Sequence, residues 1–173
     1  VLHYKDSLIV PGFIDAHIHF PQLEVVASHG DQLLDWLRNH VFPAEARFAD
    51  HAHASSVARR FLDELLRNGT TTALVFGSSH MGAVDAFFEA ASKLGLRMIA
   101  GKVLMDHNAP DSVIDTPESG YRDSAELIRR WHGKGRLSYA VTPRFAITCT
   151  GEQLHRAGEL LAEHPGVYLH THL

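Results

Sequence analysis

The alternation of β-rich runs with amphipathic stretches limits the fold of this chain more than any other feature of its sequence. The β-rich runs are residues 8–19, 70–76, 96–105, 137–142 and 167–172. Apolar residues at helical spacing occupy the stretches between them, at residues 32–40, 51–68, 81–94, 121–132 and 151–163. A strand, a helix and a further strand in this order form a βα unit, in which the strands lie parallel in one sheet.

Residues with defined roles at helix ends support these boundaries. Asp31, Asp50 and Thr150 each stand immediately before a helical stretch, where a side-chain oxygen can accept from the first backbone N–H groups. Pro43 is expected to end the helix at residues 32–40, because proline lacks the N–H that a helix interior needs. The polar segment at residues 106–120 is expected to form a loop.

Two closures of a parallel sheet are compatible with this order, an open doubly wound sheet and a barrel. No Gly-x-Gly-x-x-Gly follows a strand, which weakens a nucleotide-binding open sheet. Histidines gather at the ends of the first and last β-rich runs, where barrel enzymes build their sites. We therefore expect an α/β fold of the (β/α)8 TIM-like barrel type, present over residues 1–173 as an N-terminal partial barrel of about five βα units. Both ends of the chain look truncated, and the remaining strands are expected to follow Leu173.

The composition limits the compartment and the partners. Hydrophobic residues make up 45% of the 173 residues, which is enough for one buried core. The chain carries 16 Lys and Arg against 20 Asp and Glu with no basic block, so nucleic acid is not an expected partner. Cys149 is the only cysteine, which excludes an internal disulfide and fits a cytoplasmic protein. No apolar run approaches about 18 residues, so no membrane span is expected.

Among the 14 histidines of the chain, His17 and His19 form the strongest candidate pair. Side chains on a strand alternate between faces, so both imidazoles point the same way and form half of a divalent-metal site. The alternative is a strand end with two incidental histidines. His170 and His172 repeat this spacing in the last β-rich run. His172 lies nearer the carboxyl end and is the better ligand candidate, whereas we expect His170 to lie in the core or to support the site.

The first of these histidine pairs lies in a longer motif. Pro-Gly-Phe-Ile-Asp-Ala-His-Ile-His at residues 11–19 resembles the first-strand signature of the amidohydrolase superfamily of metal-dependent hydrolases. In that superfamily the His-x-His pair, a histidine that ends the fifth strand and an aspartate of the eighth strand bind the metal. The resemblance implies that His17, His19 and His172 bind Zn²⁺, with Fe²⁺ as an alternative. The eighth-strand aspartate and a sixth-strand histidine have no counterpart in this sequence.

A second motif narrows the resemblance. Thr-Pro-Arg-Phe at residues 142–145 is similar to the guanine deaminase branch of the superfamily. Four further segments resemble the same branch. They are His-Phe-Pro-Gln at 19–22, Trp-Leu at 36–37, Phe-Pro-Ala-Glu at 42–45 and Asn-Gly-Thr-Thr-Thr at 68–72. The branch implies zinc-dependent hydrolytic deamination of guanine to xanthine and ammonia. The proton-shuttling glutamate of the family is expected beyond Leu173, so no catalytic residue is assigned within the chain.

The resemblance also implies that Gln22, Arg144 and Phe145 contact the purine. Guanine presents O6 and N7 as adjacent acceptors, and the guanidinium of Arg144 can donate to both, as arginine does in DNA readout. The amide of Gln22 could read the ring edge at N3, and Phe145 could stack on the purine. The alternatives are a surface salt bridge for Arg144 and core packing for Phe145. Leu33 and Trp36 either wall the pocket or pack in the core.

Other functions remain open from the sequence alone. Another amidohydrolase could act on a ring amine or a chloro-substituted heterocycle, although Thr-Pro-Arg-Phe argues against it. A metal-binding module without turnover is the other alternative. The His-x-Glu and Pro-Cys-x-x-Cys motifs of cytidine-type deaminases and the His-Glu-x-x-His motif of zincins are absent. The expected partner is a small purine substrate, and we expect the full-length protein to be a homodimer.

Overall fold

A parallel sheet runs through the computed structural model, which describes residues 3–29 and 32–173. Its strands are β1 (Phe13–His19), β2 (Thr70–Phe76), β3 (Arg97–Gly101), β4 (Val103–Leu104), β5 (Ser138–Pro143) and β6 (Tyr168–Leu169). The order in the sheet is β1-β2-β3-β5, and β4 and β6 each pair with β5. Every pair is parallel.

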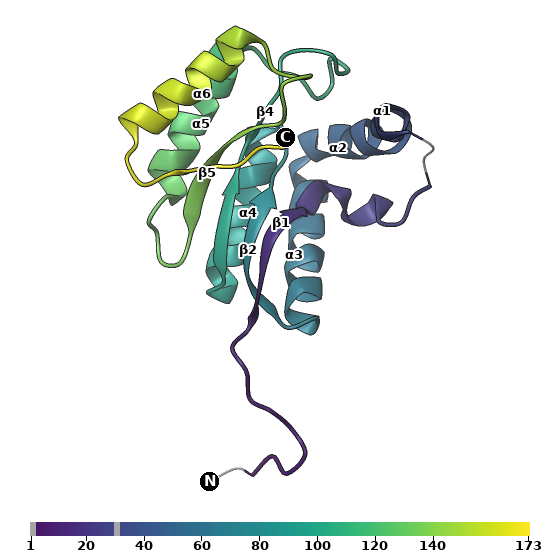
Figure 1. The fold of residues 1–173 in the computed structure, drawn as a ribbon, viewed down its shortest axis with the longest axis vertical. Helices are drawn as coiled ribbons and strands as arrows, with labels where there is room; N and C mark the ends of the chain where they lie inside the picture. Colours follow the sequence, from purple (N-terminus) through teal and green to yellow (C-terminus); the bar gives the residue numbers. More distant parts are fainter. Residues whose placement is uncertain (1–2, 30–31) are drawn as a thin grey trace.

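The strand order distinguishes a barrel from an open doubly wound sheet. β1, β2, β3 and β5 are neighbours in the order in which the chain makes them, without the reversal that defines a doubly wound sheet. The main helices are α3 (His51–Arg67), α4 (Met81–Leu94), α5 (Pro117–Trp131) and α6 (Gly151–Glu163). α3 packs on α4, α4 on α5 and α5 on α6, so they form one continuous outer layer (Figure 1). The expected partial (β/α)8-type arrangement is confirmed.

The main core lies between the sheet and this helix layer. Every residue of β5 is buried, as expected for a parallel strand that is covered on both faces. Phe20, directly after β1, is fully buried, and its ring lies 5.1 Å from that of Phe48 and 5.2 Å from that of Phe87. The aromatic cluster therefore anchors the segment that follows the two histidines of β1.

The segment between β1 and α3 departs from the prediction. It contains the 3-10 turns η1 (Phe20–Val25) and η3 (Arg47–Ala49), the short helices α1 (Leu33–Trp36) and α2 (Phe42–Ala46), and the π-helical turn η2 (Leu37–Val41). The prediction that Pro43 ends the first helix is wrong, because Pro43 lies in the first turn of α2, where the missing N–H costs nothing. The expected cap Asp31 lies outside the described residues.

Other element ends also differ. β1 begins at Phe13, and the segment before it extends away from the sheet (Figure 1). The third β-rich run is interrupted at Lys102, whose buried ammonium pairs with Asp115. α5 begins earlier than expected because the Thr116 hydroxyl accepts from the Ser119 N–H. Caps at Asp50 and Thr150 formed as predicted.

Candidate metal centre

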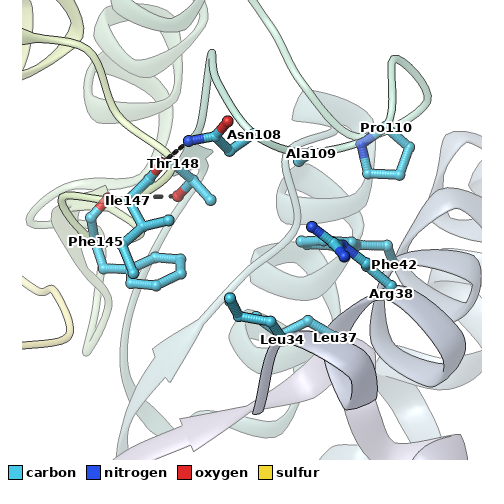
Figure 2. Close-up of a pocket in the computed structure, with 10 residues that line it drawn as sticks. All are labelled: Leu34, Leu37, Arg38, Phe42, Asn108, Ala109, Pro110, Phe145, Ile147 and Thr148. Carbon is cyan, nitrogen blue, oxygen red and sulfur yellow. Dashed lines mark hydrogen bonds between the residues drawn. The ribbon is translucent and has the colours of Figure 1, made fainter. Parts of the chain in front are cut away.

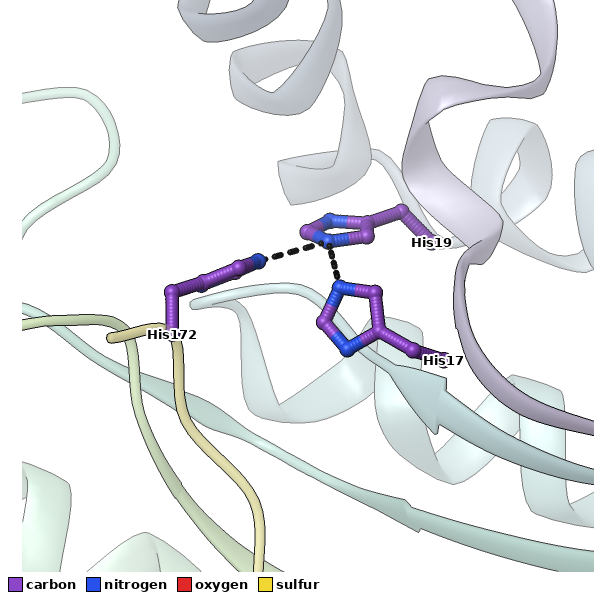
Figure 3. Close-up of side chains that lie close together, drawn as sticks. All are labelled: His17, His19 and His172. Carbon is purple, nitrogen blue, oxygen red and sulfur yellow. Dashed lines mark hydrogen bonds between the residues drawn. The ribbon is translucent and has the colours of Figure 1, made fainter.

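Three imidazoles converge at the carboxyl edge of the sheet (Figure 3). His17 and His19 end β1, and His172 follows β6. Their ligand nitrogens all lie within 4.8 Å of one another. His19 Nε2 is 3.2 Å from His17 Nε2 and 3.1 Å from His172 Nε2. Two nitrogens that bind one tetrahedral ion at about 2.0–2.1 Å lie about 3.3–3.4 Å apart, so the spacing fits a shared metal ion.

The outer nitrogens of two of these rings are held by acceptors. His172 Nδ1 lies 2.8 Å from the carbonyl oxygen of Arg144. A carbonyl only accepts, so Nδ1 carries the proton and Nε2 presents its lone pair to the cluster. His17 Nδ1 lies 2.8 Å from His170 Nε2, which can accept in the same way. Metal-binding imidazoles in proteins are commonly oriented by such a hydrogen bond from the second ring nitrogen.

His19 has a different outer partner. Its Nδ1 lies 2.9 Å from Nε2 of Gln22, and the same amide nitrogen donates to Glu45 Oε1 at 3.2 Å. In this arrangement Nδ1 accepts and the ring proton lies on Nε2. Metal binding through His19 Nε2 therefore requires the Gln22 amide to turn over, so that its oxygen accepts from Nδ1–H.

Two other residues that the sequence singled out, His170 and Arg144, are both buried. His170 is buried behind His17, with 6% of its surface exposed, rather than inside the three-histidine cluster. The Arg144 side chain is also buried, and its Nη1 donates to Glu45 Oε2 at 2.6 Å. The surface salt bridge considered for Arg144 is therefore wrong. Glu45, from α2, was assigned no role by the sequence reasoning, although the motif at residues 42–45 contains it.

Electrostatics keep three of these imidazoles neutral. Burial, the Arg144 guanidinium and the neighbouring rings lower the pKa of His19 to about 2. Burial and the nearby His17 lower the pKa of His170 to about 4. Burial also lowers the pKa of His172, although the Arg144 carbonyl opposes the shift. Neutral imidazole is the form that binds a metal ion, so His19 and His172 do not need to lose charge first.

A small cavity joins the histidines to the predicted substrate contacts. Its volume is about 270 Å³, near the lower end of the range of about 300–1,000 Å³ that small-molecule sites span. It is lined by His19, Gln22, Leu33, Trp36, Leu37, Arg144, Phe145, His172 and Leu173. Leu33 and Trp36 therefore wall this cavity. The structure thus brings all three predicted purine contacts and two of the predicted metal ligands to one hollow.

A second cavity has a volume of about 580 Å³ (Figure 2). It is lined by Leu34, Leu37, Arg38, Phe42, Asn108, Ala109, Pro110, Phe145, Ile147 and Thr148. Leu37 and Phe145 line both cavities. The Phe145 ring lies 6.3 Å from the His172 ring at a near-perpendicular angle, and so stands at the boundary between the two spaces.

Together, the consecutive parallel βα units and the imidazole cluster at the carboxyl edge define a barrel-type scaffold with a candidate metal centre. The sequence profile of the Amidohydrolase family matches residues 8–173. The chain belongs to that family. Within residues 3–29 and 32–173, no helix has the length and apolar character needed to cross a membrane.

Comparison with individual proteins gives the same family. The chain is 57% identical to guanine deaminase of Escherichia coli over 173 residues, which is all of this chain and 39% of the relative. The structure of that enzyme superposes with a TM-score of 0.92, covering 94% of this chain and 38% of the enzyme. The chain thus spans about two fifths of the length of this relative.

Two more distant structures share the fold. A guanine deaminase of C. acetobutylicum with guanine bound in its active site is 31% identical, with a TM-score of 0.85 over 89% of this chain and 37% of that one. A variant of atrazine chlorohydrolase from Arthrobacter aurescens, complexed with zinc and atraton, is 22% identical with a TM-score of 0.80 over 94% of this chain and 40% of that one. The second likeness supports the fold alone.

Proposed function

We propose that this protein is a guanine deaminase, which hydrolyses guanine to xanthine and ammonia. The observation that carries the proposal is the buried Arg144, which lines the same small cavity as His19 and His172. The similarity to guanine deaminases of known structure supports the same substrate.

In this proposal His17, His19 and His172 bind one divalent ion, Zn²⁺, with Fe²⁺ as the alternative. Their all-nitrogen set suits a borderline ion such as Zn²⁺ better than Mg²⁺ or Ca²⁺, which favour oxygen ligands. Bound Zn²⁺ supplies hydroxide near neutral pH, because it lowers the pKa of its water to about 7. His170 and the Arg144 carbonyl hold the rings of His17 and His172 in the ligating tautomer.

The chain's own residues bind and orient the base. One nitrogen of the Arg144 guanidinium is committed to Glu45, which leaves further N–H groups to donate to O6 and N7 of guanine. Phe145 offers an aromatic face at the edge of the cavity. In the present orientation both hydrogens of Gln22 Nε2 are directed to Glu45 and His19, so only its oxygen faces outward. N3 of guanine also accepts, so pairing with N3 requires the turned-over amide.

Metal analysis and ammonia release in the full-length protein test the proposal. His17→Ala, His19→Ala and His172→Ala should each reduce the zinc content to near background and abolish xanthine formation. His155→Ala is the matched control, because its side chain is 76% exposed on α6. Unchanged zinc in all three variants would refute the metal assignment. Zinc binding by the wild type without ammonia release would favour the non-catalytic alternative.

We also propose a cytoplasmic location and a homodimeric assembly for the full-length protein. The single Cys149 fits a cytoplasmic protein, and the homodimer is carried over from the family resemblance. Fractionation of the source cells and sedimentation of the full-length protein would test these two predictions.

A further inference from the structure

Glu45 is a buried carboxylate that touches two of the predicted purine contacts. It has 5% of its surface exposed and lies on the short helix α2. Its Oε2 accepts from Arg144 Nη1 at 2.6 Å and its Oε1 accepts from Gln22 Nε2 at 3.2 Å. In this amide orientation both of its oxygens contact residues that line the small cavity, and the contact with Arg144 does not depend on that orientation.

The ion pair between Arg144 and Glu45 neutralises a buried positive charge in the cavity wall. The Arg144 guanidinium always carries its charge, and its side chain is only 3% exposed. An unpaired charge at this depth would be strongly disfavoured, and would also repel a cation bound at the neighbouring histidines. The carboxylate of Glu45 neutralises the guanidinium at close range and so allows an arginine to stand beside a metal centre.

The same contact fixes the direction of the guanidinium. Glu45 anchors Nη1 on one side, and the ring of Phe42 lies 5.3 Å from the guanidinium carbon. Within residues 3–29 and 32–173, Nη1 is the only guanidinium nitrogen of Arg144 with a hydrogen bond. Two fixed points on a planar group leave it little freedom to rotate, and the remaining N–H donors stay available to the cavity.

We propose that Glu45 is a positioning residue that aims the Arg144 guanidinium at O6 and N7 of guanine and thereby sets the preference for a 6-oxo purine. The inference deepens the proposed function and rests on it. Glu45 itself does not touch the base. It acts through Arg144, so its loss should weaken the reading of O6 more than the chemistry at C2.

The test compares guanine with 2,6-diaminopurine in the full-length holoenzyme. Both bases carry the 2-amino leaving group, but the second has an amino donor in place of O6. In Glu45→Gln the KM for guanine should rise, and kcat/KM should fall on the order of 10–100-fold, the effect of misplacing an orienting group by about 1 Å. The ratio of kcat/KM for guanine over 2,6-diaminopurine should fall with it when the rates are expressed per bound zinc, because the unpaired guanidinium also disfavours a cation at the histidines.

Asp115→Asn is the matched control, because Asp115 pairs with a second buried cation, Lys102, and does not line the cavity. It should lower stability without changing the guanine to 2,6-diaminopurine ratio. If Glu45→Gln fails to fold, Glu45→Asp keeps the charge but shortens the reach, and should lower the same ratio by a smaller factor.

The outcomes separate the two proposals. A wild type that releases no ammonia from guanine would overturn the proposed function and this inference with it. A wild type that deaminates guanine, combined with Glu45 variants whose base ratio is unchanged or falls no more than in Asp115→Asn, would overturn the inference alone.

Discussion

The Arg144 side chain should determine which purine is accepted. Adenine carries an amino donor in place of O6, so the guanidinium would face a donor that it cannot satisfy. We expect a preference for guanine over adenine of at least about 10³-fold in kcat/KM, as for other sites built around a substrate hydrogen bond. Arg144→Ala should weaken guanine turnover by about 1–3 kcal/mol, the value of one bidentate pair.

Arg144→Lys provides the matched comparison for this prediction. It keeps the charge but cannot reproduce the planar fork, so it should not restore full activity. Steady-state kinetics of the full-length protein on guanine and adenine measure both effects. Equal turnover of the two bases by the wild type, or guanine kinetics unchanged in Arg144→Ala, would rule out this role.

At the residue scale, the sequence predicted those site residues that recur at a fixed spacing within one strand. His17 and His19 were paired by the alternation of a strand, and His172 by the same spacing in the last run. Contacts between distant segments could not be predicted. Glu45 and Arg144 are 99 positions apart, and the amide orientation of Gln22 depends on Glu45 as well as on His19. Such partners become neighbours only when the sheet is assembled.

At the scale of elements, the end of α5 carries a pH-sensitive link to β5. His132 Nδ1 accepts from the Tyr139 N–H at 3.1 Å. Burial, His164 and Arg97 lower the pKa of His132 below its ordinary value of 6.5. The unfolded chain therefore binds more protons than the folded chain just below pH 6.5, and stability falls as the pH falls through that region.

His132→Asn should flatten this dependence, because the amide oxygen of asparagine can accept from Tyr139 N–H without titrating. Between pH 7.5 and pH 5.5, the urea midpoint of unfolding should fall less in His132→Asn than in the unsubstituted parent protein. For one proton, the two proteins can differ in the slope of the unfolding free energy against pH by at most about 1.4 kcal/mol per pH unit. His155→Asn, at an exposed position, should behave as the parent. A His132→Asn profile parallel to that of the parent would contradict the prediction.

Element boundaries were predicted well where one residue decides them. β2 and α4 begin and end as the sequence indicated, and Gly95 adopts the left-handed conformation after α4. The predictions failed where tertiary contacts compete with local preference. β3 ends before Lys102, whose N–H donates to the Tyr139 hydroxyl rather than to the backbone of a neighbouring strand and whose ammonium pairs with Asp115. The π-helical turn at Leu37–Val41 has no local signal, and two of its residues, Leu37 and Val41, are buried in the smaller core cluster.

At the scale of the whole molecule, the described sheet has two open sides. β1 and β6 each pair with a single strand. Apolar side chains lie exposed on both, with Ile14 at 74% and Leu169 at 54%. Unpaired strands with exposed apolar residues favour association between chains.

We therefore expect these 173 residues, expressed alone, to associate and to form no xanthine. Ile14→Lys combined with Leu169→Lys should shift sedimentation towards the monomer, because charge on an edge strand opposes pairing. Leu94→Lys changes a side chain of similar exposure, 46%, on α4 and should leave association unchanged. A monomeric parent chain in sedimentation, or measurable xanthine from it, would contradict the prediction.

The architecture itself was predictable because it depends on order rather than on contacts. Alternating βα units with metal-type residues at strand ends indicated a barrel, and the consecutive order of β1, β2, β3 and β5 confirmed it. Closure of the barrel could not be predicted from this sequence, because the family relatives are more than twice as long as this chain.

The hydrogen bond from His172 Nδ1 to the Arg144 carbonyl uses an atom that every amino acid possesses. A mutation at position 144 exchanges the proposed base-contacting group but keeps the oxygen that orients the imidazole. Proline is the exception, because the Arg144 N–H donates to the Leu104 carbonyl. If the proposed function holds, a substitution at position 144 that still gives Glu45 a hydrogen-bond donor can change the substrate range and keep the hydrogen bond that orients His172.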